Sequence, residues 1–251
     1  MERLTDKVDI ILTSPFYNTN KKAGNSRTIG NTHVKSGQYN HVRYDVHVDN
    51  MTNDEYCDFT VKLFNSFGKV LRKNGCVLYN ISYGAENTEG MFLAVADILR
   101  KTDFTLADTI IWKKKSALPN NCSPNRLTRI TEYIFVFCRK DELMTFRCNK
   151  KVVSHRPTGQ SMYENVFNFI EAANNDGPCP YNKATFSSEL VEKLLDIYAN
   201  EDSVVYDPFM GSGTTAVGCI RKMCKCYGSE LSENQCRFAE DRIEKELRKR
   251  T

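Results

Sequence analysis

The sequence predicts an α/β protein with a mostly parallel sheet and helices on both faces. Along the 251 residues, runs of strand length alternate with stretches of helical periodicity, which is the pattern of βαβ units. The first run, at 8–13, is almost continuously apolar, as expected for a strand buried on both faces. A short β-branched run at 204–207 ends in an acid, and a glycine-rich turn and a helical segment follow it.

Capping signals place the predicted helices. Thr52-Asn53-Asp54-Glu55 is a capping box that opens a helix, and Lys73-Asn74-Gly75 is expected to close it. Ser187 is expected to cap a helix that reaches about Ala199, and a second capping box at Ser232 starts a charged last helix. The other predicted elements are a helix at 90–101 and strands at 76–81, 106–112, 132–138 and 226–230.

Two stretches interrupt this alternation. Residues 19–50 are polar and rich in Gly and Asn, so we expect a long mobile loop, and loops of that length tend to be functional. Residues 140–185 have few long apolar runs and many polar and aromatic residues, so we interpret them as an inserted recognition module. The expected division is therefore 1–139, which holds the first strand end and the loop, then 140–185, then 186–251, which holds the glycine turn.

Composition limits the class of protein. The chain is 41% hydrophobic, enough for a sizeable core, and no run of 18 apolar residues predicts a membrane-spanning helix. Residues 1–6 lack the basic start and apolar core of a signal peptide, so we expect a cytoplasmic protein with no membrane partner. The ten cysteines show no C-x-x-C spacing, so we expect reduced, buried thiols and no metal site.

The glycine turn at 207–215 is the first candidate site. Its glycines allow a tight turn and a close ligand, and the following helix directs free N–H groups and a positive dipole end at that space. Glu230 follows Gly211 by nineteen residues, where an acid usually holds a nucleotide's ribose hydroxyls. The lysine of a P-loop is missing. The pattern favours a nucleoside-type cofactor, and the alternative is a purely structural strand-to-helix turn.

The first strand ends in the second candidate site, Ser14-Pro15-Phe16-Tyr17. This tetrapeptide resembles the [DNS]-P-P-[YFW] catalytic motif of the amino-methylating DNA methyltransferases, and 207–214 resembles their S-adenosylmethionine motif. The order, catalytic motif first, is one of the circular permutations of that family. Arg129-x-x-Glu132-Tyr133-x-x-x-Phe137 and Lys183-Ala184-x-Phe186-Ser187 resemble further family segments. The resemblance spans the chain and implies a Rossmann-like S-adenosylmethionine-dependent methyltransferase fold with a small target-recognition insertion.

Amino methylation needs acceptor groups at the catalytic motif. The exocyclic amine of cytosine or adenine is a poor nucleophile because its lone pair is delocalised into the ring. Two acceptors against its hydrogens, the Ser14 hydroxyl and the Pro15 carbonyl, would localise that pair toward the methyl donor. Tyr17, and in a secondary role Phe16, would stack on a base flipped out of the duplex. Phe16 replaces the usual second proline and removes its bias on the preceding backbone, but the acceptor carbonyl belongs to Pro15, so we still expect activity.

The expected cofactor site joins the glycine turn to the segment before the helix at Ser187. Spacing assigns the ribose hydroxyls to Glu230. The resemblance puts Asp207 and Phe209 near the methionine part, although Phe209 could equally be a core residue. The S-adenosylmethionine-binding residues that we expect are Asp207, Pro208, Phe209, Gly211, Ser212, Gly213, Thr214, Glu230, Lys183, Phe186 and Ser187.

Basic residues crowd the middle of the chain, although the net charge is only +4. Basic clusters among Asn, Ser and aromatic residues fit a surface for a phosphate backbone, and the alternative is a solvated face. We expect double-stranded DNA as the partner, and the resemblance adds a cognate restriction enzyme and a homodimer. The expected DNA-contacting residues are Lys21, Lys22, Lys113, Lys114, Lys115, Arg126, Arg129, Lys150, Lys151 and Arg156.

Several alternatives stay open. Ser14 favours cytosine N4 weakly over adenine N6. Family members usually carry a strand with a Gly-Asp pair ahead of the catalytic strand, and this chain starts too late for it. One hypothesis is an internal start or a truncated gene, which would leave a catalytically impaired DNA-binding remnant. Methylation of RNA or of glutamine, which uses a related Asn-Pro-Pro-Tyr motif, is disfavoured by Ser14 and by 140–185. We expect a prokaryotic or phage origin.

Overall fold

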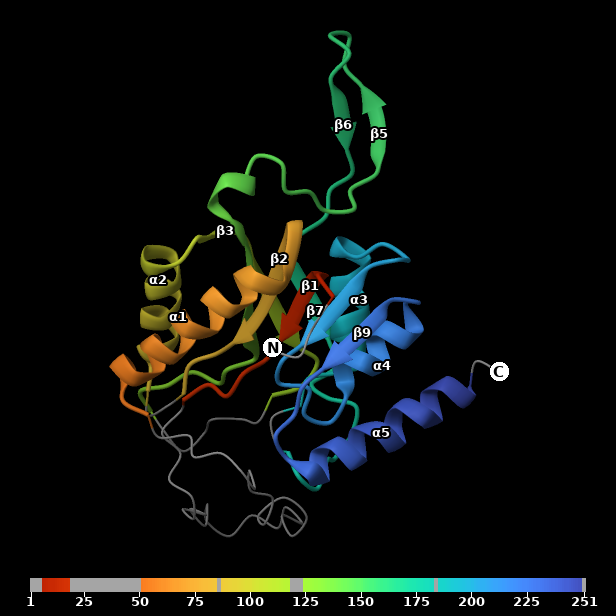
Figure 1. Cartoon of the computed structure of the whole chain (residues 1–251). Coiled ribbons are helices and arrows are strands. Elements are labelled where there is room, and N and C mark those ends of the chain that lie inside the picture. Colours follow the sequence, from red (N-terminus) through yellow and green to blue (C-terminus); the bar gives the residue numbers. More distant parts are fainter. Residues whose placement is uncertain (1–5, 19–50, 85–86, 118–123, 183–184, 250–251) are drawn as a thin grey trace.

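The computed structural model describes residues 6–18, 51–84, 87–117, 124–182 and 185–249 (Figure 1). The expected loop at 19–50 lies outside these residues. The elements follow one another as β1 (Val8–Thr13), α1 (Asn53–Val70), β2 (Leu71–Ile81), α2 (Gly90–Lys101), β3 (Phe104–Lys114), β4 (Thr131–Arg139), η2 (Lys140–Glu142), β5 (Val152–His155), β6 (Ser161–Tyr163), β7 (Phe169–Ala172), α3 (Ser188–Tyr198), β8 (Val204–Asp207), α4 (Thr214–Arg221), β9 (Lys225–Gly228) and α5 (Glu233–Arg248).

Seven strands form one sheet in the order β7-β3-β4-β2-β1-β8-β9. The pairs β1–β2, β1–β8, β8–β9 and β3–β7 are parallel, and only β4 runs antiparallel to its neighbours β2 and β3. The mostly parallel α/β sheet predicted from the sequence is therefore confirmed. Every strand but β4 ends at the same edge of the sheet, and β4 begins there.

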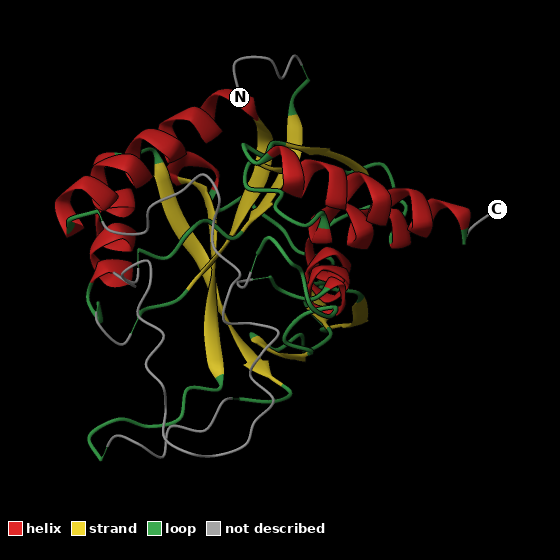
Figure 2. Cartoon of the chain, turned by 90° about the horizontal axis from the view of Figure 1, so that it is seen from below, coloured by secondary structure: helices red, strands yellow, loops and turns green. Residues whose placement is uncertain are grey.

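Helices cover both faces of the sheet, as expected. α1 and α2 lie over one face and α3 and α4 over the other, while α5 crosses beside the glycine turn (Figures 1 and 2). Residues of β1 enter two separate cores: Val8 and Ile11 pack beneath α1, and Ile10 and Leu12 pack beneath α3, with a register shift between Val8 and Ile10. This explains why the run at 8–13 is almost continuously apolar.

The predicted starts of the helices at Thr52, Ser187 and Ser232 are confirmed, and one predicted helix end is wrong. Thr52 Oγ1 accepts from Glu55 N at 3.2 Å while Thr52 N donates to Glu55 Oε2 at 2.8 Å, so the capping box is present. The helix, however, ends at Val70, and Lys73-Asn74-Gly75 belongs to β2. A Cβ at Gly75 would lie 2.7 Å from Asp9 O, so this glycine permits close approach of β2 to β1 and does not cap the helix.

The antiparallel ribbon of β5 and β6 projects away from the rest of the molecule (Figure 1). It follows the end of β4 and precedes the start of β7, so it leaves the sheet opposite the edge where β1 and β8 end. Within 140–185, however, β7 pairs with β3 and is part of the main sheet. The region interpreted as a recognition module therefore contains both a projecting ribbon and a sheet strand.

No helix among the described residues is long and apolar enough to cross a membrane. The nine described cysteines are unpaired thiols. No group of three His, Cys, Asp or Glu in this part of the chain could hold a metal ion.

Candidate active site

The two motifs singled out from the sequence meet at one edge of the sheet. β1 pairs with β8 in parallel, so the tetrapeptide after Thr13 and the turn after Asp207 emerge side by side. Asp207 joins them directly: its Oδ1 accepts from Thr13 Oγ1 at 2.7 Å and from Phe209 N at 3.0 Å. Its Oδ2 accepts from Thr215 Oγ1 at 2.5 Å. Thr13 was not among the expected site residues, because its role depends on this pairing. Thr215 ends the predicted turn at 207–215 but was not among the expected cofactor-binding residues.

Asp207 is a buried clamp beneath the turn. Its side chain is fully buried, and burial raises the pKa of this carboxyl to about 6, although the hydrogen bonds from Thr215, Thr13 and the Phe209 N–H lower it. The nearby charge of Glu230 adds to the rise. Both carboxylate oxygens accept hydrogen bonds from the protein, so Asp207 fixes the position of the turn relative to β1.

Two glycines shape the turn. Gly211 and Gly213 have φ values of 52° and 78°, which L side chains rarely adopt. A Cβ at Gly213 would also lie 2.9 Å from the Cβ of Ala239 on α5. α4 begins directly after, at Thr214, so its free N–H groups face the end of the turn. The backbone therefore offers a close, positively polarised surface at the end of β8.

Glu230 braces the other side of the turn. Its Oε2 accepts from Gly211 N at 2.8 Å, and its Oε1 accepts from Leu231 N and Ser232 N at 2.9 Å each. A carboxylate has about four lone-pair sites, so acceptor capacity is left for hydroxyl groups of a ligand. Glu230 is only half-buried. These features fit the role in ribose binding that its spacing predicts.

The segment before α3 has a structural role, of which the sequence predicted the helix cap at Ser187. Ser187 is fully buried; its hydroxyl donates to Ala173 O at 2.7 Å and accepts from Leu190 N, which caps α3. Phe186 packs against the core beneath α3. The expected Lys183 lies outside the described residues. The two described side chains of this expected cofactor segment, Phe186 and Ser187, therefore anchor α3.

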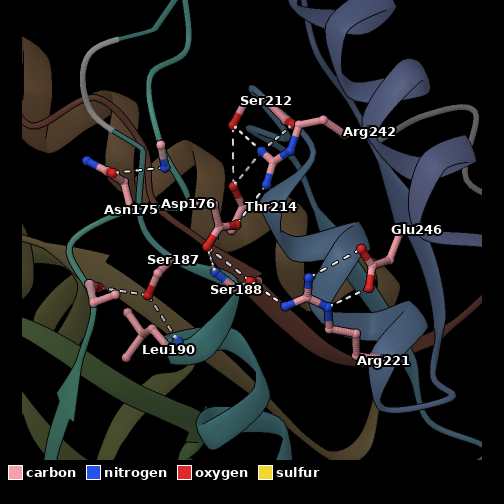
Figure 3. Close-up of polar contacts among 12 residues, drawn as sticks. Asn175, Asp176, Ser187, Ser188, Leu190, Ser212, Thr214, Arg221, Arg242 and Glu246 are labelled. Atoms are coloured by element: carbon pink, nitrogen blue, oxygen red, sulfur yellow. Dashed lines mark hydrogen bonds and ion pairs between the residues drawn. The ribbon is translucent and has the colours of Figure 1, made fainter. Parts of the chain in front are cut away.

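Arg242 of α5 ties this segment to the glycine turn (Figure 3). Its Nη1 donates to Ser212 O at 2.8 Å, to Ser212 Oγ at 3.0 Å and to Thr214 Oγ1 at 3.2 Å. Its Nη2 donates to Asp176 Oδ2 at 2.7 Å, and Asp176 Oδ1 accepts from the N–H and hydroxyl of Ser188. Arg242 was not among the predicted site residues, because the sequence of its helix is that of an ordinary charged surface helix.

The candidate catalytic tetrapeptide, Ser14-Pro15-Phe16-Tyr17, starts a chain of side-chain hydrogen bonds. Ser14 Oγ lies 3.0 Å from Tyr17 Oη. The Tyr17 hydroxyl also lies within hydrogen-bonding distance of two acceptors, Asn80 Oδ1 at 3.1 Å and Glu132 Oε2 at 2.9 Å. Asn80 lies one residue before the end of β2 and Glu132 is the second residue of β4, so both come from the same edge of the sheet. Glu132 also forms an ion pair with Lys114. Asn80 was not expected here, and Glu132 was noted only as part of a family-like segment.

Phe16 and Phe209 belong to an aromatic cluster. Phe16 packs on Tyr56 and Phe59 of α1, with ring centroids 5.5 and 5.1 Å away, and Phe209 lies 6.3 Å from Phe59. The two rings themselves lie 6.5 Å apart, edge to face. The hydroxyl of Tyr56 donates to Phe16 O at 2.7 Å. Phe209 thus joins the core beneath α1 and packs the glycine turn against Phe16 of the tetrapeptide.

The expected DNA-contacting residues are spread over the molecule. Lys113, Lys114 and Lys115 each form an ion pair with an acid, namely Glu171, Glu132 and Glu189. Arg129 stacks on Tyr83 at 4.9 Å, near the catalytic edge. The exposed Lys150, Lys151 and Arg156 lie in or next to the β5–β6 ribbon, which the structure does not bring to the catalytic tetrapeptide. Arg126 is exposed, and Lys21 and Lys22 lie outside the described residues.

The fold and these motifs define a class of enzyme that places a nucleoside cofactor beside an acceptor site. Comparisons with known proteins agree. The family model described as DNA methylase, of the N6 and N4 amino type, matches residues 8–241. The orphan methyltransferase M.BamHII of Bacillus amyloliquefaciens is 27% identical over 208 residues, which are 70% of this chain and 77% of that protein. The type II methyltransferase M.SmaI of Serratia marcescens is 29% identical over 59% of this chain and 50% of that protein.

Solved structures share the fold. The PvuII DNA methyltransferase, described as cytosine-N4-specific, has a TM-score of 0.66 at 15% identity and covers 97% of this chain and 86% of its own. The M1.HpyAVI complex with S-adenosylmethionine has a TM-score of 0.57 at 20% identity and covers 95% of this chain and 89% of its own. This chain belongs to the DNA methylase family of N6/N4 methyltransferases. As a member, it is a DNA amino-methyltransferase that uses S-adenosylmethionine.

Proposed function

We propose that this chain methylates cytosine N4, in preference to adenine N6, on a base rotated out of duplex DNA. One observation carries the proposal: Ser14 and Pro15 follow β1 directly beside the glycine turn, and Asp207 fixes the two segments together. An amine held against Ser14 would therefore face a methyl group held at the turn. Ser14 in place of aspartate supports cytosine N4 weakly.

The residues of the chain act on the amine. The Ser14 hydroxyl and the Pro15 carbonyl each accept a hydrogen bond from the NH₂ group and direct its lone pair out of conjugation with the ring. S-adenosylmethionine, when bound, supplies a methyl group made electrophilic by its sulfonium. Fixed acceptors also stabilise the positive charge that develops on nitrogen in the transition state, so their effect appears in the transfer step. Positioning of amine and methyl in line contributes the rest.

The cofactor residues divide into contacts and supports. We propose that the turn backbone from Gly211 to Thr214 and the half-buried Glu230 contact the cofactor, with Glu230 at the ribose hydroxyls. The buried Asp207 supports the turn from below. Phe209, between the turn and Phe16, would border the methyl group.

Methyl transfer from labelled S-adenosylmethionine to unmethylated genomic DNA tests the function. Wild-type protein should label the DNA, and nucleoside analysis should give N4-methylcytosine. Tyr17→Ala removes the stacking ring and Ser14→Ala removes an acceptor, so each should lower the rate by about 100-fold or more. Ser66→Ala, at a half-buried serine on α1 that lies outside the candidate site, is the matched control and should retain full activity. N6-methyladenine would overturn the choice of base. Absence of cofactor binding by calorimetry would leave the DNA-binding remnant.

We propose that double-stranded DNA is contacted at two places. Arg126 and Arg129 would contact phosphates near the flipped base, and residues 140–185 would read DNA away from that base through the β5–β6 ribbon, which leaves the opposite edge of the sheet. A two-stranded ribbon fits the major groove, and Lys150, Lys151 and Arg156 give this one a basic surface. Replacing these three by Gln should weaken DNA binding and flatten its salt dependence, because fewer counterions are released. Unchanged binding at all salt concentrations would remove the ribbon from the interface.

We also propose cytoplasmic action beside a cognate restriction enzyme, with a homodimer as the assembled form. Several relatives are described as type II methyltransferases and one as an orphan, so both settings occur among them. Extracts of the source cell should cut unmethylated DNA and spare DNA methylated by this protein. Sedimentation equilibrium should give twice the mass of the chain. Cutting of both DNA samples, or a monomer mass, would contradict the respective part.

A further inference from the structure

The ion pair between Glu132 and Lys114 lies next to the catalytic tetrapeptide but has no role in the proposed chemistry. Glu132 is the second residue of β4 and Lys114 ends β3, and their side chains are 14% and 25% exposed. Lys114 Nζ donates to Glu132 Oε1, which leaves Oε2 directed at Tyr17 Oη, 2.9 Å away. A carboxylate is thus held two hydrogen bonds away from Ser14 Oγ.

The direction of each hydrogen bond in this chain follows from counting hydrogens. The hydroxyl of Tyr17 has one hydrogen. Two of its neighbours, Asn80 Oδ1 and the ionised Glu132, offer only lone pairs, and the bond to a charged acceptor is the stronger. Tyr17 therefore donates to Glu132, the charged and closer of the two acceptors. Its contact with Ser14 Oγ at 3.0 Å must then be made with Ser14 as the donor.

The structure assigns Glu132 as a positioning residue that sets the polarity of the catalytic serine. Because Tyr17 gives its hydrogen to Glu132, Ser14 gives its own hydrogen to Tyr17 and presents lone pairs to the substrate amine. This inference rests on the proposed role of Ser14 as an acceptor. It also gives Tyr17 a second task, since its ring can stack on the base while its hydroxyl passes the polarity from Glu132 to Ser14.

A hydrogen bond of the opposite direction, from Tyr17 to Ser14, would oppose catalysis. If Tyr17 donated to Ser14, the Ser14 hydrogen would be free to turn toward the amine, where it would meet the NH₂ hydrogens. Serine differs from aspartate in this respect: a carboxylate is always an acceptor, whereas a hydroxyl accepts with full effect only when its hydrogen is engaged elsewhere. A serine-containing motif therefore gains from a fixed charge behind it. Glu132, held by Lys114 and by the Asn80 amide 3.5 Å away, is placed to supply that charge.

Two conservative variants test this polarity. Glu132→Gln keeps the shape but lets an amide N–H face Tyr17, and Tyr17→Phe keeps the ring but removes the relay oxygen. Each should lower the single-turnover rate of methyl transfer by on the order of 10- to 100-fold, at or below the loss on removing a direct oxyanion-hole donor. KM for S-adenosylmethionine and the Kd for DNA should stay within about twofold. The double variant should be no slower than the slower single variant, because both changes break one chain.

The matched control is Glu171→Gln. Glu171 pairs with the neighbouring lysine, Lys113, across β3 and β7, but has no contact with the tetrapeptide among its described bonds. It should transfer methyl at the wild-type rate. Thermal unfolding of each variant separates loss of fold from loss of rate. A wild-type rate in Glu132→Gln, or additive losses in the double variant, would overturn the assignment. An inactive wild-type protein would instead overturn the proposed function.

Discussion

The acceptor side and the cofactor turn are built from different materials. At the acceptor side, the proposed chemistry lies with half-exposed side chains, Ser14 and Tyr17, in a hydrogen-bonded chain that ends at Glu132. At the turn, the proposed cofactor contacts are made mainly by backbone groups. The side chains around these groups point inward and hold the backbone in place. Asp207 and Ser212 are both buried there.

This difference teaches where function and stability are coupled. A change in the acceptor chain removes a polar group from a rigid strand end, so the rate should fall while the fold stands. A change at the turn moves the backbone that we propose contacts the cofactor, so affinity and stability should fall together. The most informative tests change a residue at the turn and compare it with a control residue that has the same backbone conformation or the same type of side chain but lies outside the turn.

Gly213→Ala should have the largest effect. Gly213 has a φ of 78°, and a new Cβ would lie 2.9 Å from the Cβ and 3.1 Å from the Cα of Ala239. We expect loss of cofactor binding and destabilisation by about 3 kcal/mol, combining left-handed strain with overpacking. Gly159→Ala is the control: its φ is 82°, but nothing lies within 4 Å of the new Cβ, so it should cost about 1 kcal/mol and leave binding unchanged. Calorimetry with S-adenosylhomocysteine and urea unfolding measure both. Equal effects would contradict the close-packing argument.

The second-largest expected effect is a pH dependence of the free energy of unfolding that comes from Asp207. Burial raises its folded pKa to about 6, against about 4 in an unfolded chain. Between these values the folded chain keeps a proton that the unfolded chain has released, so this stability is present below pH 4 and is lost as pH rises through 6. The loss amounts to about 3 kcal/mol for two pKa units.

The measurement is the difference in unfolding free energy between wild type and Asp207→Asn across pH 4 to 7. The difference cancels other acids, such as Glu246, whose ion pair with Arg221 lowers its pKa to about 2. Asp207→Asn should show a smaller fall than wild type. Thr13→Val removes a donor that lowers the pKa of Asp207, so its fall should extend to higher pH. Parallel profiles for all three proteins would refute a titrating Asp207.

The sequence was sufficient wherever the signal was local. The alternating elements, the buried strand at 8–13 and the glycine turn with its acid at 230 depend on periodicity and on short-range spacing. Even the meeting of the two motifs was predictable, because parallel strands end at one edge of a sheet. Gly75 shows the limit: a basic stretch with a glycine after a helix is also what a C-cap looks like. In the structure this stretch is instead part of β2, which pairs with β1.

The supporting residues needed the register of distant strands. Glu132 reaches Tyr17 because β4 runs antiparallel beside β2, with Asn80 opposite Ile134. No pattern near Glu132 indicates that register. The same holds for Arg242, thirty residues after Ser212, whose helix has a charged, mostly exposed surface. Side chains that act on a site through a partner carry little signal in the sequence itself.

Arg242 gives the smallest predicted effect and the sharpest comparison. Arg242→Gln should raise KM for S-adenosylmethionine about tenfold, which corresponds to about 1.4 kcal/mol, because Ser212 and Thr214 lose the group that holds them. Arg221→Gln is the matched control: Arg221 bonds to Glu246 and to Ser188, so it also joins α3, α4 and α5, but it contacts no residue of the turn in its described bonds (Figure 3).

Both arginine variants should lose about 1–2 kcal/mol of unfolding free energy, since each loses several hydrogen bonds to charged or buried groups. Only Arg242→Gln should change KM, and kcat should stay close to wild type in both. Arg242→Lys keeps the charge but cannot bridge Asp176 and the turn with one planar group, so it should recover little of the affinity. If Arg221→Gln raised KM equally, the effect would belong to helix packing in general. The turn would then be no more sensitive than the rest of the fold.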